Sequence, residues 1–112
     1  MDVTRTDDGE ITILGIAGEI NFATSPALEQ AVAAGVAAGR RLILLDLGAV
    51  RYVSSAGLRA ILVGAKRAKA AGGGLAIFGL QPSVREVFLL SGFERMMPVV
   101  ERAAQAREEL LK

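Results

Sequence analysis

Short runs of apolar residues alternate along this chain with longer segments whose apolar residues recur at helical spacing. Runs of the first kind predict strands, and the 3.6-residue spacing predicts amphipathic helices. The run at 42–47 has no polar alternation, so we expect a central strand that is buried on both faces. The predicted strands are 3–5, 11–17, 42–47, 75–78 and 96–100, and the predicted helices are 25–38, 55–71, 82–91 and 101–112.

Turn-forming residues separate these elements. Asp8-Gly9 favours a hairpin, and Ser25-Pro26 predicts a helix that has Ser as its cap and Pro as its first residue. The segment 18–21 predicts a bend or a second short strand. Glycines at 39 and 72–74 end helices. Alternating strands and helices in 112 residues indicate one α/β domain.

One stretch places a carboxylate and two hydroxyls at the predicted joint between a strand and a helix. Asp46 is expected to end the strand, and Ser54 or Ser55 is expected to cap the helix. In open α/β sheets, ligands usually lie beyond the carboxyl ends of strands. Ordinary helix capping explains the same serines, so the spacing by itself favours a structural role and leaves a functional one open.

Composition narrows the classes of function. The net charge of +1 and the 4% aromatic content provide neither the field nor the stacking surface of a nucleic-acid-binding protein. The chain has no Cys and no His, which removes thiol chemistry, the usual general base and most zinc sites. The glycine run lacks the residues of a phosphate-binding loop. An enzyme of this composition would have to work with carboxylates, hydroxyls and lysines alone, so an enzyme is disfavoured, and we expect no cofactor or metal.

The chain contains no apolar run of the length of a membrane span, and its first residues do not resemble a secretory signal. We therefore expect a cytoplasmic protein that does not insert into membranes. The nearly balanced charge makes a monomer with transient complexes the expected oligomeric state.

Four segments resemble the STAS domain, and more narrowly the bacterial anti-sigma factor antagonists. The resemblance covers almost the whole chain, 1–112, and implies a single STAS-like domain with a mixed sheet of four or five strands and about four helices. The segments are Leu-Leu-Asp-Leu at 44–47, Tyr-Val-Ser-Ser-Ala-Gly-Leu at 52–58, Gly-Gly-Gly-Leu at 72–75 and Pro-Ser-Val-Arg-Glu-Val-Phe at 82–88.

The resemblance implies a partner-switching role in the control of transcription. In that family the unmodified antagonist binds an anti-sigma factor, which is also a serine kinase with a histidine-kinase-like ATP fold. The kinase phosphorylates a Ser at the start of the second helix and so ends binding, and a PP2C-type phosphatase reverses the modification. The family motif places this modification at Ser55, with Ser54 as the alternative. Gly57 and Asp46 match motif positions that support the site.

The resemblance also implies a docking surface around the modified serine. The predicted partner-binding residues are Asn21, Ser54, Ser55, Arg59, Val63 and Lys66. The cations among them also fit an ordinary solvated helix face.

Two other functions remain open. One is a STAS subunit that docks constitutively on a lipid-transport ATPase complex, without phosphorylation. The other is a small nucleotide hydrolase using Asp46 and Ser55, which is disfavoured because no base is evident to activate a hydroxyl.

Overall fold

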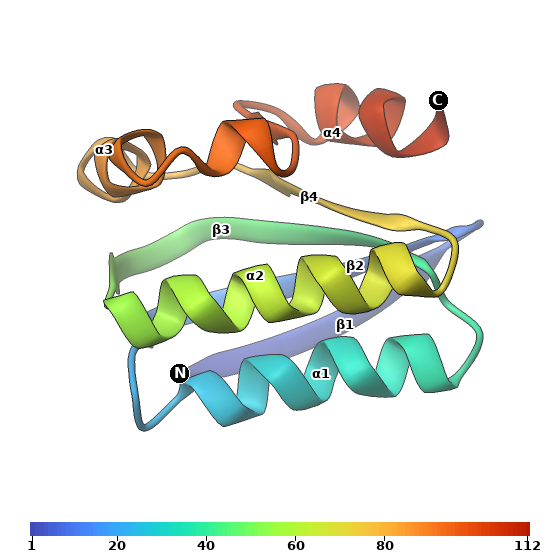
Figure 1. Cartoon of the computed structure of the whole chain (residues 1–112), viewed down its shortest axis with the longest axis horizontal. Helices are drawn as coiled ribbons and strands as arrows, with labels where there is room; N and C mark the ends of the chain where they lie inside the picture. Colours follow the sequence, from blue (N-terminus) through green and yellow to red (C-terminus); the bar gives the residue numbers. More distant parts are fainter.

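A five-stranded sheet runs through the middle of the molecule (Figure 1), and helices pack on both of its faces. The computed structural model describes residues 1–112. The strand order is β1-β2-β3-β4-β5; β1 and β2 are antiparallel, and all later neighbours are parallel. The elements are β1 (Asp2–Asp8), β2 (Ile11–Ile20), α1 (Ser25–Ala37), β3 (Leu42–Val53), α2 (Ser55–Ala70), β4 (Gly74–Phe78), α3 (Pro82–Leu90), the 3₁₀ turn η1 (Phe93–Arg95), β5 (Val99–Val100) and α4 (Ala103–Leu111).

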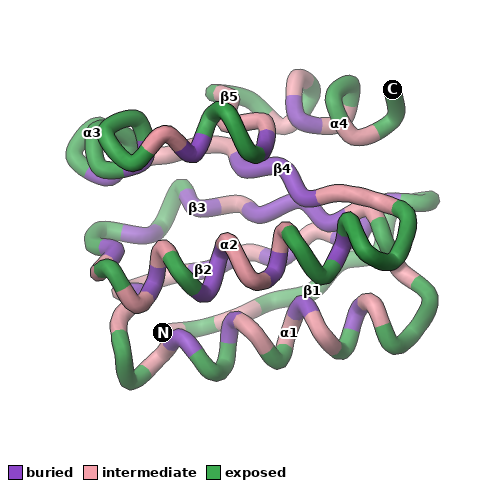
Figure 2. Tube along the Cα trace, viewed as in Figure 1, coloured by how far each residue is buried: buried purple, intermediate pink, exposed green.

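The prediction of a mixed α/β sheet with four helices is confirmed, and the layers explain the apolar run in β3. Side chains alternate between the two faces of a strand. Ile43 and Leu45 face the core formed with α1, α2 and α3, whereas Leu44 packs against Ala106 of α4. Figure 2 shows buried residues along β3 and β4 and on the inner sides of the helices. No helix combines the length and apolar character that crossing a bilayer requires.

β3 is longer than the sequence predicts, and Asp46 does not end it. The strand runs to Val53, which pairs with Ile20 at the end of an equally extended β2. Two register shifts allow this pairing, and Gly18 adopts a φ of 106° beside one of them. Of the two alternatives for 18–21, a bend or a short strand, residues 18–20 form a strand, which is the continuation of β2, and the bend begins at Asn21.

Beyond the middle of the sheet only these two strands continue. β1 pairs with β2 no further than Ala17, and β4 pairs with β3 no further than Asp46. The last residues of β2 and β3 therefore form a two-stranded extension, which ends where α1 and α2 begin.

Smaller differences have local causes. α1 begins at Ser25, so the cap residue is Thr24 and not Ser25 as predicted. Ser25 instead donates two hydrogen bonds to the carbonyl of Asn21, from its hydroxyl at 2.5 Å and from its N–H at 2.8 Å. The predicted last strand shortens to Val99–Val100. The preceding turn instead buries Phe93 in the core, where its ring meets Phe88 edge to face at 5.2 Å.

A polar network fixes the hairpin, whose turn lies at Gly9-Glu10. Thr12 is fully buried; its hydroxyl accepts a hydrogen bond from Arg40 at 2.8 Å and donates one to Asp7 at 3.0 Å. A hydrogen bond from Arg5, together with the one from Thr12, holds the pKa of Asp7 below its ordinary value. The end of α1 is thereby tied to the first two strands.

Candidate functional site

A hollow of about 550 Å³ lies where the N-terminal ends of α1 and α2 come side by side. These ends follow the carboxyl ends of β2 and β3, which is the edge where α/β sheets usually place ligands. Figure 1 shows the two helices lying alongside each other on one face of the sheet. The hollow is lined by Phe22, Ser25, Pro26 and Glu29 before and within α1, and by Ser55, Ala56 and Arg59 of α2.

The two adjacent serines have different roles in the structure. Ser54 is the cap of α2: its φ is −83° and its ψ is 174°, and its hydroxyl accepts a hydrogen bond from the N–H of Gly57 at 3.2 Å. Ser55 is the first helical residue; its side chain is exposed, lines the hollow and makes no hydrogen bond. Of the two hydroxyls, only that of Ser55 is uncommitted.

Loss of the Ser54 cap should weaken the start of α2. We expect Ser54→Ala to lower the free energy of unfolding by about 1 kcal/mol, because the Gly57 N–H loses its partner. Chemical denaturation monitored by circular dichroism measures this change. Ser55→Ala is the matched control and should stay within about 0.5 kcal/mol of the unmodified chain. An equal loss in both variants would contradict the division of roles.

Gly57 allows α2 to approach the end of β2 closely. A Cβ on this buried residue would lie 2.6 Å from the carbonyl oxygen of Ile20 and 2.9 Å from a methyl of Val53. The same carbonyl accepts the N–H of Ser54 at 2.9 Å. Gly57 therefore supports the site through packing, because any larger residue pushes the serines away from the sheet.

Asn21 shapes the loop before α1. Its side-chain oxygen accepts hydrogen bonds from the backbone N–H groups of Ala23 at 3.0 Å and Thr24 at 3.1 Å. The Thr24 hydroxyl accepts from the N–H of Asn21 at 2.8 Å and donates to the carbonyl of Glu19 at 2.9 Å. Asn21 is thus engaged within the chain and is not among the residues that line the hollow.

This loop presents Phe22, which the sequence analysis did not single out. Its side chain is 86% exposed and forms one wall of the hollow. Phe22 lies between Asn21 and the start of the helix at Ser25-Pro26, outside every predicted strand and helix. An aromatic residue in such a loop is the sequence signal that could have identified Phe22 as a candidate. Aromatic residues are enriched in protein interfaces relative to the rest of the surface.

Asp46 lies away from the serines. It is in the middle of β3, opposite Gly15 and Phe78, and its carboxylate accepts the N–H of Gly48 at 3.0 Å. Alternation along the strand places it on the same sheet face as Leu44, opposite to α1 and α2. It lines a separate hollow of about 340 Å³. The expectation that Asp46 ends the strand is therefore wrong, because β3 continues past it for seven residues, and Asp46 does not line the hollow at Ser55.

The remaining predicted residues spread along α2. Arg59 is exposed and lines the hollow, whereas Val63 is half-buried one turn further on. Lys66 is exposed about 16 Å from Ser55 along the helix axis. It lines another hollow, shared with Arg95 of η1. Only Ser55 and Arg59, of the predicted set, line the hollow at the start of the helices.

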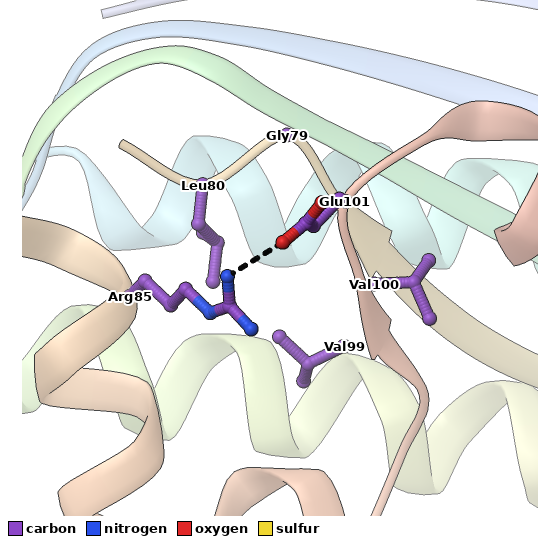
Figure 3. Close-up of a pocket in the computed structure, with 6 residues that line it drawn as sticks. All are labelled: Gly79, Leu80, Arg85, Val99, Val100 and Glu101. Atoms are coloured by element: carbon purple, nitrogen blue, oxygen red, sulfur yellow. Dashed lines mark hydrogen bonds and ion pairs between the residues drawn. The ribbon is translucent and has the colours of Figure 1, made fainter. Parts of the chain in front are cut away.

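Another hollow lies at the ends of β4 and β5, and its two charged side chains bind each other (Figure 3). Arg85 of α3 and Glu101 point toward each other across it and form an ion pair at 3.0 Å. Each charge is therefore already matched. No cluster of side chains that could hold a metal ion occurs in the structure.

The comparisons agree with this fold. The STAS domain family model matches residues 2–106. BtrV of Bordetella bronchiseptica, provisionally named as an anti-sigma factor antagonist, is 41% identical over 95% of this chain and 94% of its own length. RsfB of Mycobacterium tuberculosis, an anti-sigma-F factor antagonist, is 39% identical over 51% of this chain and 47% of its own.

A crystal structure of another protein has the same fold as this chain. An anti-sigma factor antagonist from Mycobacterium paratuberculosis superposes with a TM-score of 0.88 and 25% identity, over 99% of this chain and 94% of that chain. The chain belongs to the STAS domain family, and these relatives within it are named as anti-sigma factor antagonists.

Proposed function

We propose that this protein is an anti-sigma factor antagonist that binds its partner through the surface around the Ser55 hollow. The observation that carries the proposal is the exposed and uncommitted hydroxyl of Ser55, which lies in one hollow with Phe22 and Arg59. A large exposed aromatic group and an Arg are the side chains that most often anchor protein interfaces. The names of the relatives supply the class of partner, an anti-sigma factor.

Binding is controlled by phosphorylation of Ser55. The partner is itself the serine kinase, a PP2C-type phosphatase removes the phosphate, and the cycle runs in the bacterial cytoplasm. The antagonist contributes no catalysis. Ser54 is the poorer acceptor, because its hydroxyl already accepts the N–H of Gly57.

The fold accommodates a phosphate at this position. Phosphorylation adds about −1.5 to −2 charge units, and the first turn of a helix stabilises a nearby anion. The modification therefore acts by placing charge and bulk in the docking surface, while the domain stays folded.

Phosphorylation assays on single serine variants test the proposal. The unmodified chain, Ser54→Ala and Ser55→Ala are each incubated with Mg-ATP and, one at a time, the histidine-kinase-like serine kinases of the same bacterium. Intact and peptide mass spectrometry then count and locate phosphates. We expect a single phosphate on Ser55 that only Ser55→Ala abolishes.

Other results would correct the proposal in defined ways. Absence of phosphate with kinases that modify their own antagonists would contradict it and favour a STAS subunit that docks constitutively on a lipid-transport ATPase complex. A phosphate on Ser54 would contradict the assignment of the site.

A further inference from the structure

Arg59 lies one helical turn after Ser55 and lines the same hollow. Residues four apart on a helix are neighbours, with Cβ atoms about 5–6 Å from each other. Arg59 is exposed, and its guanidinium takes part in none of the ion pairs or side-chain hydrogen bonds of the structure. It is therefore a cation within reach of the serine that has no partner of its own.

The other charges around the hollow define what Arg59 can bind. Glu29 of α1 is the only other charged residue that lines it, and its carboxylate forms no ion pair. The charges toward the ends of the adjoining strands, Glu19 and Arg51, are paired with each other at 3.3 Å. A new anion at Ser55 would thus meet one free cation, Arg59, and one carboxylate, Glu29.

We propose that Arg59 is the intramolecular receptor for the phosphate on Ser55. The planar guanidinium donates parallel hydrogen bonds to phosphate oxygens, a geometry that Lys cannot reproduce. The inference rests on the proposed phosphorylation of Ser55 and adds a second effect of it. In the unmodified protein Arg59 is available to the partner; in the modified protein it is bound to the phosphate. One modification thereby adds an anion to the docking surface and withdraws a cation from it.

The ionisation of the phosphate reports this contact directly. Phosphoserine is incorporated at position 55 during translation, so no kinase is required, and its second pKa, ordinarily about 6, is followed by ³¹P NMR at low ionic strength. A neighbouring cation favours the dianion and lowers this pKa. We expect Arg59→Gln to raise the pKa by about 0.3, as an exposed i,i+4 ion pair implies, and Arg59→Lys to raise it by less.

Two matched variants distinguish direct contact between Arg59 and the phosphate from a general effect of the surrounding charges. Lys66→Gln removes a cation from the same helix about 16 Å further along, and should leave the pKa within about 0.1 of its original value. Glu29→Gln removes the carboxylate across the hollow and should lower the pKa. All three positions are exposed or half-buried, and the thermal midpoint of each variant verifies folding.

The inference is overturned if Arg59→Gln leaves the pKa unchanged, or if Lys66→Gln raises it equally. A failure to find a kinase would count against the proposed function alone, because the phosphate in this experiment is introduced without one.

Discussion

Gly57→Ala is expected to lower the free energy of unfolding by about 3 kcal/mol. The new methyl group would lie 2.6 Å from the backbone oxygen of Ile20 and 2.9 Å from a methyl of that residue, well inside contact distance. Neither α2 nor β2 can yield easily, because the same oxygen accepts the N–H of Ser54 at 2.9 Å. Urea denaturation of the purified variant measures the loss.

Gly35→Ala provides the control, because it adds the same methyl group to another buried helical glycine. There the nearest atoms are a methyl of Ile43 at 3.5 Å and Cβ of Arg40 at 4.0 Å, which are ordinary contacts. The higher helix propensity of Ala should then stabilise the protein by up to about 1 kcal/mol. Equal stability of the Gly57→Ala variant and the original chain would show that α2 can move off the sheet without cost.

A phosphate on Ser55 is expected to weaken binding to the anti-sigma factor by at least about 30-fold. Arg59 matches only part of the −1.5 to −2 charge of the phosphate, so net negative charge remains. Burying an uncompensated charge in a protein interface costs about 2–5 kcal/mol, which corresponds to a loss of roughly 30-fold to several thousand-fold. Isothermal titration calorimetry with phosphoserine introduced at position 55 measures the affinity. The thermal midpoint should stay within about 2 °C, since the start of α2 tolerates the anion.

Phosphoserine at Ser83 is the matched control for this measurement. Ser83 is exposed and is the second residue of α3, so it shares the helix-start environment but does not line the Ser55 hollow. Its modification should leave the affinity nearly unchanged. An equal loss of affinity at both positions would indicate a general effect of charge, and a large fall in the midpoint after modification of Ser55 would indicate unfolding.

The central strands and the four helices could be predicted because burial demands continuous apolar runs in those strands and apolar residues at helical spacing in the helices. The second half of β3 could not, since Gly48, Ala49 and Arg51 are exposed and leave no such pattern. That half forms through backbone pairing with β2. The misplacement of Asp46 follows from the same cause: a strand that appears to end at an acid in fact continues past it.

The candidate site could be predicted in outline, from Ser55, Gly57 and Arg59. The sequence pattern for a helix cap is satisfied by either serine. The choice between them depends on the backbone at Ser54, which is extended with a ψ of 174°. The exposure of Phe22 depends on the turn that Asn21 and Thr24 build together. Both features arise from hydrogen bonds between loop residues, for which periodicity contains no signal.

The narrowing of the sheet to two strands at the serine edge exposes backbone there that neighbouring strands cover in the rest of the sheet. A two-stranded ribbon is marginally stable without its surroundings, whereas the five-stranded part is held by both helical layers. Ile20, Val50 and Val53 of the ribbon stay buried in the core, but beyond Ala17 and Asp46 its outer edges have no neighbouring strand. Amides that face these edges therefore exchange with solvent sooner than those of the five-stranded part. The proposed docking edge thus combines exposed backbone with side chains that are fixed in the core.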